Sequence, residues 1–418
     1  MNTPRLRFKD LGEINYPEWE WKKIEDCCLL IKDGTHGTHK DVIAGIPLLS
    51  AKDIYENSVH IPFDARKISE HDYKKIYSKY ELKKEDVLIT IVGTLGRTAI
   101  IDSNTPRIAF QRSVAVMRPS TQLITAKYLN YVCNSHNFQN EIEIRKKKGA
   151  QPGIYLGELS SISIPVPSLP EQQKIADFLS TYDEKIRLQR ERVETLERRK
   201  KGLLQKIFSQ EIRFNADDGI EFPAWTLKAL GDIFSFKNGL NASRDSFENG
   251  NIPCIGVYDI CRCAPITENA IRGYVSVDSN IKESFRVNFG DVLFQRSSET
   301  LQDVGHACVY IGKESVVYNG FVIKGTPKKQ RQYIPEFIHW MLQSDFVRRQ
   351  AIAFGAGAQH YNIGQESISS IIGYFPCVAE QKKIAKLFTA VDDQINIEKE
   401  RLSTMETIKK GLLQGLFC

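Results

Sequence analysis

The sequence predicts an α+β protein with an internal duplication, in which two globular domains are separated by two long helices that pair as an antiparallel coiled coil. Length is one reason, because 418 residues exceed what one hydrophobic core usually organises. Another is a set of short motifs that recur in the same order in both halves. A heptad pattern that closes each half is the third.

The duplication is visible as pairs of similar motifs at a nearly constant offset. The pairs are LRFK (6–9) with IRFN (212–215), INYPEW (14–19) with IEFPAW (220–225), and KKGLLQKIF (200–208) with KKGLLQGLF (409–417). Chance can supply one such match but not an ordered series of them. The two halves, each of about 200 residues, therefore share one layout.

These matches set the expected domain boundaries. The first globular domain is expected at 1–169 and the second at 209–378, with spacer helices at 170–208 and 379–418. Within the domains, β-branched and aromatic runs predict strands, and apolar faces predict helices. The strands are expected over 87–94, 107–119, 292–296 and 315–327, and the helices over 126–142 and 335–352.

Each spacer helix carries apolar residues at alternating steps of four and three, which is the spacing of a coiled-coil seam. The seam runs from Ile175 to Ile207 in the first helix and from Ile384 to Leu416 in the second. Polar residues interrupt both seams at matching places and would fix their register. Ordinary amphipathic core helices are the alternative interpretation.

Further apolar residues lie off the seam, where a two-helix coiled coil would leave them exposed. Such residues are candidates for binding partner subunits, unless the globular domains cover them. They are Phe178, Leu188 and Leu204 in the first helix, and Leu387, Ile397 and Leu413 in the second.

Composition argues against several functional classes. The net charge of +6 is too small for a protein that binds nucleic acid through backbone charge alone. The sequence contains no apolar run near the roughly 20 residues that span a bilayer, so no membrane association is expected. Nine cysteines without a CxxC pair fit reduced thiols and a cytoplasmic location.

Motifs for cofactor chemistry are missing from the sequence. It has no GxxxxGK[ST], no GxGxxG after a predicted strand and no HExxH, so we expect no cofactor and no metal. His36 and His39 in a Gly/Thr loop could suggest a metal site, but a polar turn is the preferred interpretation. A catalytic Cys–His pair that includes Cys27, Cys28 or Cys308 stays open, although no pattern singles one out.

Polar residues between the predicted strands suit the edges of DNA bases. Arg and Lys pair with guanine, and Asn and Gln with adenine, in the major groove. The basic run 145–148 is a candidate for phosphate contacts or a solvated face. The first-domain candidates are Lys32, Thr35, His36, Thr38, Lys52, Thr94, Arg97, Gln111, Arg112, Lys146, Lys147 and Gln151. The second-domain candidates are Asn238, Arg244, Arg296, Ser297, Asn319, Gln359, His360 and Tyr361.

The spacer helices also carry a family resemblance. EQQKIADFLSTYDEKI (171–186) matches EQKKIAKLFTAVDDQI (380–395), and a Gly-Ala-Gln turn precedes each helix, at 149–151 and 357–359. With the KKGLLQ endings, these features closely resemble the specificity (S) subunit of type I restriction–modification enzymes over the full length. LLIKDGTHGTH (29–39) resembles the opening of one common class of recognition domain, from which the second half departs.

The resemblance implies that each globular domain is a target recognition domain for one half of a bipartite, asymmetric site in double-stranded DNA. It also implies that the helices hold these domains apart and dock two methyltransferase subunits, and that restriction/translocase subunits join through the complex. The family's S subunit is not catalytic, so no enzymatic activity is expected of this chain. The alternatives are a duplicated protein-binding scaffold without DNA recognition, and a stand-alone nuclease or methyltransferase.

Overall fold

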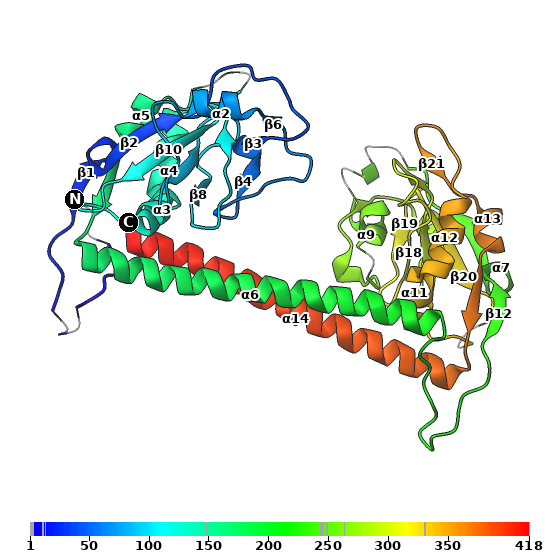
Figure 1. The fold of residues 1–418 in the computed structure, drawn as a ribbon. Coiled ribbons are helices and arrows are strands. Elements are labelled where there is room, and N and C mark those ends of the chain that lie inside the picture. The colour runs from blue at the N-terminus through cyan, green and yellow to red at the C-terminus, as the bar shows by residue number, and fades with distance from the viewer. Residues whose placement is uncertain are drawn as a thin grey trace. The chain divides into compact units, whose positions relative to one another are not determined.

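The computed structural model describes residues 4–10, 12, 14–147, 149, 151–242, 246–247, 250–262, 264–329 and 332–417. It confirms the duplicated α+β architecture (Figure 1). The chain divides into two compact units, each of which is described by itself. Unit 1 comprises residues 1–190 and 401–418, and unit 2 comprises residues 191–400. Each unit therefore combines one globular domain with parts of both long helices.

Unit 1 is organised around a four-stranded antiparallel sheet in the order β2-β10-β7-β8. Its strands are β2 (Cys28–Asp33), β10 (Val114–Pro119), β7 (Val87–Thr90) and β8 (Thr98–Ile100). Successive side chains of a strand point to opposite faces, and both faces of β7 are buried. Val87 and Ile89 contribute to the core that includes the following helices, whereas Leu88 packs with Leu49 and Phe110.

Smaller elements of unit 1 surround this sheet. Strand β1 (Glu20–Lys23) pairs with β11 (Ser163–Val166), and β3 (Ile46–Leu49) lies between β6 (Lys67–Ile68) and β9 (Ala109–Phe110). A short hairpin consists of β4 (Ile54–Tyr55) and β5 (Ser58–Val59). The short helices are α1 (Ile24–Cys27), η1 (Ala51–Asp53), α2 (Glu70–Ile76) and α5 (Leu156–Ser160).

Unit 2 repeats the same plan around a four-stranded sheet in the order β13-β20-β16-β18. Those strands are β13 (Phe234–Asn238), β20 (Val322–Pro327), β16 (Val292–Gln295) and β18 (Ala307–Val309). The remaining strands are β12 (Thr226–Ala229), β14 (Ile252–Ile255), β15 (Tyr274–Val275), β17 (Ser297–Ser298), β19 (Val317–Tyr318), β21 (Tyr361–Asn362) and β22 (Ile372–Phe375). The short helices are α7 (Leu230–Ile233), α9 (Val257–Cys261), η2 (Glu268–Ala270), α10 (Ser279–Ser284) and α13 (Gln365–Ser370).

The helices predicted over 126–142 and 335–352 are each divided by a serine. The observed helices are α3 (Ala126–Cys133) and α4 (His136–Arg145) in unit 1, and α11 (Pro335–Gln343) and α12 (Asp345–Ala353) in unit 2. Ser135 Oγ accepts a hydrogen bond from Phe138 N, and Ser344 Oγ accepts one from Val347 N. A serine in this position caps the start of a new helix, so apolar periodicity alone did not reveal the break.

The spacer helices are α6 (Leu169–Phe208) and α14 (Val378–Phe417), each of 40 residues. Their pairing is antiparallel in each unit. In unit 1, Asp183 forms an ion pair with Lys409, and Arg190 forms one with Glu406 at 2.6 Å. In unit 2, the ion pairs that join α6 and α14 include two at 2.6 Å. These are Glu197 with Lys399 and Lys200 with Asp392. Among the described residues, no helix is both long and apolar enough to cross a membrane.

A buried carboxylate fastens the first turns of α6 to the amino-terminal segment of unit 1. Glu171 is fully buried and accepts hydrogen bonds from Arg7 Nε at 3.1 Å, Arg7 Nη2 at 2.9 Å and Trp19 Nε1 at 3.0 Å. Arg7, Trp19 and Glu171 each belong to a motif that is repeated in the second half. The sequence alone did not explain why these three motifs recur together. The hydrogen bonds explain the recurrence, because the three motifs meet in one site.

Unit 2 contains the same site at the start of α14. Glu380 is fully buried and accepts from Arg213 Nε at 3.2 Å, Arg213 Nη2 at 2.8 Å and Trp225 Nε1 at 2.9 Å. A buried carboxylate is tolerated when it is paired and hydrogen-bonded. The Arg–Glu–Trp cluster therefore defines how each globular domain is held on its spacer helix.

Candidate nucleic-acid interface

In unit 1, loops that carry the predicted DNA-binding residues meet at one end of strand β10. Thr35 N donates to Phe110 O at 2.8 Å, and Arg112 N donates to Thr35 O at 3.0 Å. Gln111 N donates to Leu49 O at 2.8 Å, which places the loop of Lys52 beside the same turn. The side chain of Arg112 is exposed and that of Gln111 is half-buried. The fold thus brings together candidates from three separate parts of the sequence.

The Gly-Thr-His loop beside this turn is held by local polar contacts. His36 Nε2 lies 2.5 Å from Asp33 Oδ2, whereas His39 Nε2 lies 2.8 Å from Thr35 Oγ1. The two histidines therefore have different partners. Among the described residues, no three His, Cys, Asp or Glu side chains gather as a metal site would require. Lys32 and Thr38 are exposed in the same region.

Other unit 1 candidates lie along the β7–β8 connection. Gly93 N donates to Pro152 O at 2.9 Å, so the loop of Thr94 and Arg97 runs beside the segment of Gln151. Thr94, Arg97, Lys147 and Gln151 are exposed and Lys146 is half-buried. Lys146 forms an ion pair with Glu143, and Lys147 Nζ lies 4.0 Å from the centre of the Tyr155 ring. Lys148 of the basic run lies outside the described residues. The described lysines, Lys146 and Lys147, are therefore only partly available to phosphate.

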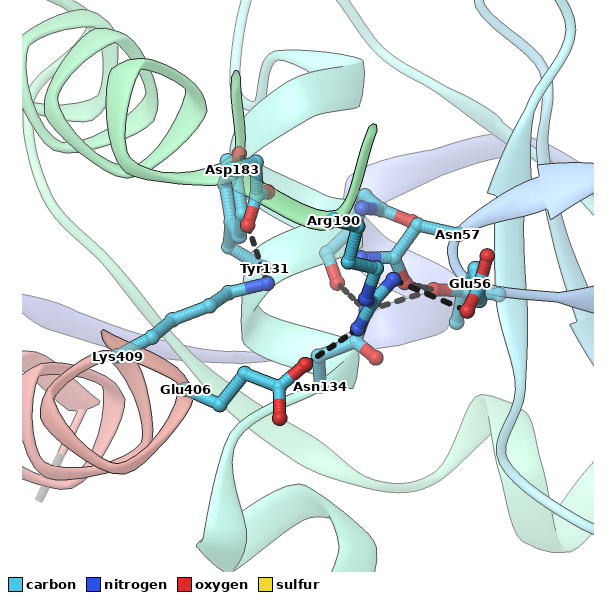
Figure 2. A network of polar contacts seen from close by, with 10 residues as sticks. Glu56, Asn57, Tyr131, Asn134, Asp183, Arg190, Glu406 and Lys409 are labelled. Carbon is cyan, nitrogen blue, oxygen red and sulfur yellow. Dashed lines mark hydrogen bonds and ion pairs between the residues drawn. The ribbon is translucent and has the colours of Figure 1, made fainter. Parts of the chain in front are cut away.

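Figure 2 shows how the hairpin β4–β5 contacts the helix pair of unit 1. Its turn residues Glu56 and Asn57 have positive φ angles of 52° and 57°, a left-handed conformation that a two-residue hairpin requires. Glu56 Oε1 lies 3.0 Å from Arg190 Nη1, and Arg190 Nη2 lies 2.6 Å from Glu406 Oε1. Arg190 thus joins α6, α14 and the hairpin, although partly exposed ion pairs contribute little stability.

In a second part of this network, Tyr131 of α3 contacts the helix pair (Figure 2). Tyr131 OH donates to Asp183 Oδ2 at 2.8 Å, and Asp183 also forms an ion pair with Lys409. Burial and the neighbouring Asp183 carboxylate raise the pKa of Tyr131, which keeps its hydroxyl protonated as a donor. These contacts fix α3, and through it the sheet of unit 1, on the helix pair.

In unit 2, the predicted residues Arg296, Ser297 and Asn319 line a cavity of about 580 Å³. Strand β17 pairs with β21, which brings the predicted Tyr361 beside Ser298. Gln359 and His360 are exposed in the loop before β21, and Asn238 is exposed at the end of β13. Arg244 lies outside the described residues.

Sequence analysis missed Asn241 and Phe321 among the residues of this cavity, which Asn362 of the candidate run 359–362 also lines. Ser297 Oγ donates to Asn362 Oδ1 at 2.5 Å, so Asn362 supports the predicted serine. Phe321 is 62% exposed at the tip of a turn. It falls in the run 315–327, which predicted a strand, and only the offset to the polar turn of the first half could have shown that it lies in a turn.

The off-seam apolar residues of the spacer helices fall into two groups. Phe178, Leu188 and Ile397 are 37%, 50% and 47% exposed. The others are half-buried against globular cores, Leu204 and Leu387 in unit 2 and Leu413 in unit 1. The first group retains apolar surface that could contact another protein.

Comparison with known proteins adds a family assignment to this geometry. The model of the type I restriction modification DNA specificity domain matches residues 17–198 and 224–407. The chain is 25% identical to the type I restriction enzyme MjaIX specificity subunit of Methanocaldococcus jannaschii, over 97% of this chain and 94% of that protein. It is 21% identical to the EcoKI specificity subunit of Escherichia coli, over 89% and 82% of the two chains.

Solved structures share the fold. The S subunit of a type I restriction–modification system from M. genitalium aligns with a TM-score of 0.56 at 17% identity, covering 100% of this chain and 99% of that one. A chain from a study of complex assembly in the type I system aligns with a TM-score of 0.59 at 16% identity, covering 96% and 98%. At these identities the likeness concerns the fold alone.

Proposed function

Because the chain belongs to the family defined by the type I restriction modification DNA specificity domain, we propose that each of its globular domains reads one half of a bipartite DNA site. The observation that carries this proposal is a turn that is repeated in both domains. Gln111 N donates to Leu49 O at 2.8 Å, and Asn319 N donates to Ile255 O at 3.0 Å. Two amide-bearing turns at equivalent places suit two separate readers.

The chain would be the DNA-recognition subunit of a type I restriction–modification complex and would itself perform no catalytic step. Two methyltransferase subunits would supply methylation, and restriction/translocase subunits would join through that complex. The matched positions of the two spacer helices support two copies of one partner, because a duplicated surface binds the same protein twice. DNA affinity would then be shared among subunits, in keeping with the mild charge of this chain.

Substituting Gln111 and Arg112 with alanine should change the recognised sequence in one half-site only. Substituting Arg296 and Asn319 should change the other half-site. Each lost bidentate base contact should weaken binding by about 1–3 kcal/mol, or about 5- to 150-fold. Sequencing of methylated DNA from a host that carries each variant, with its partner subunits, measures both half-sites at once.

Gln122 and Lys127 provide a control for these variants, because both are exposed and follow the opposite end of β10. Alanine at these positions should leave the methylated motif unchanged. If either recognition variant altered both half-sites equally, two independent readers would be refuted. If the methylated DNA motif persisted in a host that lacks this chain, the protein-binding scaffold would be favoured instead.

For the partner surface, replacing Leu188 and Ile397 with glutamate should prevent co-purification of the methyltransferase subunits. Both side chains are about half exposed, so the isolated chain should keep its fold, as measured by circular dichroism and thermal unfolding. Burying a charge in an apolar interface is costly, whereas methionine at the same positions preserves apolar contact and should preserve assembly. Normal assembly of the glutamate variant would remove this surface from the proposal.

A further inference from the structure

The repeated turn makes the same backbone hydrogen bonds in both domains but carries different side chains. It comprises residues 111–114, from the end of β9 to the first residue of β10, and residues 319–322, from the end of β19 to the first residue of β20. Val114 N donates to Gln111 O and Val322 N donates to Asn319 O, both at 3.0 Å. The first turn reads Gln-Arg-Ser-Val and the second Asn-Gly-Phe-Val. An equivalent scaffold thus presents a guanidinium in unit 1 and an aromatic ring in unit 2.

The second turn is rigidly supported beneath its exposed ring. Asn319 Oδ1 accepts a hydrogen bond from Phe321 N at 3.1 Å, and Phe321 O accepts one from Arg296 N at 2.8 Å. Both backbone polar groups of Phe321 are therefore engaged within the protein. The ring itself remains 62% exposed beside the cavity. An exposed aromatic ring on a backbone that is held in place has the features of a preorganised contact.

An amide lies directly against the same turn. A Cβ atom on Gly320 would lie 2.0 Å from Asn241 Oδ1, so only glycine lets Asn241 approach this closely. Asn241 is exposed and lines the cavity together with Phe321. The structure therefore places an asparagine amide against the turn that carries the phenyl ring, and both residues line one cavity.

These two groups complement the two halves of an A·T pair. An asparagine amide can pair with N6 and N7 of adenine in the major groove. In the same groove, the paired thymine presents its 5-methyl group, which is apolar. We propose that Phe321 is a specificity-determining residue that packs against a thymine methyl group in the half-site of the second domain, with Asn241 on the paired adenine. This inference rests on the proposed DNA-reading function and specifies the base pair that one turn contacts.

The first domain has no aromatic residue in the equivalent turn. Its corresponding residue is Ser113, whose Oγ accepts a hydrogen bond from Ala51 N at 3.0 Å. The exposed residue there is Arg112, which suits guanine. We therefore expect binding to depend on a thymine methyl group through this turn in the half-site of the second domain, and not in that of the first.

Deoxyuridine tests the proposal because it lacks only the methyl group of thymine. The probe is a duplex that carries the bipartite motif methylated by the assembled complex, with single thymines of the second half-site replaced by deoxyuridine. At one position the replacement should weaken binding of the wild-type complex about fourfold, the effect of one buried methyl-sized group. The Phe321→Ala complex should bind the thymine duplex more weakly and no longer distinguish it from the deoxyuridine duplex.

Phe321→Leu is the conservative variant, and its apolar side chain should retain most of the preference for thymine. Deoxyuridine in the first half-site should affect wild type and Phe321→Ala equally. The proposal is overturned if the second half-site contains no thymine, if wild type tolerates every deoxyuridine, or if Phe321→Ala keeps the wild-type preference. Absence of any preference of wild type for the motif over a scrambled duplex would instead reject the proposed DNA-reading function.

Discussion

A chain that ends at Glu400 should contain a folded unit 2 and an unfolded unit 1. The removed residues include Leu416 and Phe417, which are 2% and 3% exposed and belong to the core that also contains Tyr128, Ile175 and Leu179. Truncating such side chains typically costs about 2–5 kcal/mol for leucine and 3–5 kcal/mol for phenylalanine. Together these losses approach the whole stability of a domain, about 5–15 kcal/mol.

Hydrogen exchange followed by mass spectrometry can assign the loss to one unit. Peptides from residues 4–190 should lose protection in the truncated chain, and peptides from 191–400 should keep it. The double variant Leu416→Ala/Phe417→Ala should reproduce the effect, whereas alanine at the exposed Lys410 should not. Retained protection throughout unit 1 would show that the end of α14 is not part of its core.

Removing either buried carboxylate should destabilise its own unit by about 3 kcal/mol, because a charged partner is left without compensation. The variants are Glu171→Ala for unit 1 and Glu380→Ala for unit 2. The arginine side chains are 19% and 27% exposed and can regain some water, which places the cost at the lower end of the range for buried pairs. Trp19→Phe should cost about 1 kcal/mol, since it removes one donor.

Urea unfolding of the full-length variants, followed by hydrogen exchange in each unit, measures these costs. Glu184→Gln is the control for Glu171→Ala, because Glu184 also lies on α6. Among the described residues, it pairs only with the nearby Arg187. Equal destabilisation of both units by one substitution would contradict the assignment of one carboxylate to each unit. An unchanged unfolding midpoint for Glu171→Ala would contradict the importance of the cluster itself.

The fold could be predicted because its main signals are regular along the chain. The heptad spacing from Ile175 to Ile207 and its repeat in the second half are local patterns that need no three-dimensional information. The breaks at Ser135 and Ser344 were missed because a serine cap restarts a helix without disturbing apolar periodicity. The Arg–Glu–Trp clusters were missed for a different reason, since their members are far apart in the sequence and no pattern pairs them.

The candidate site was only partly predictable for a related reason. Selecting polar residues between strands found Gln111, Arg112, Arg296 and Asn319, which the fold places at two equivalent turns and their neighbouring strands. It did not find Phe321, because aromatic residues in apolar runs usually belong to the core. The backbone of the turn decides which way such a side chain faces, and that information is absent from composition and spacing.

The place of residues 401–417 within unit 1 also has a consequence for biosynthesis. They are synthesised after all of unit 2, yet they complete the core of unit 1, most of which is made first. At about 5–20 residues per second, the interval between synthesis of Arg190 and synthesis of Phe417 is about 10–45 s. During that interval Ile175, Leu179 and Tyr128 lack part of their packing and are open to chaperones or to aggregation. Unit 2 ends at Glu400 and its core needs no later residue, so we expect it to be able to complete its core before unit 1 does.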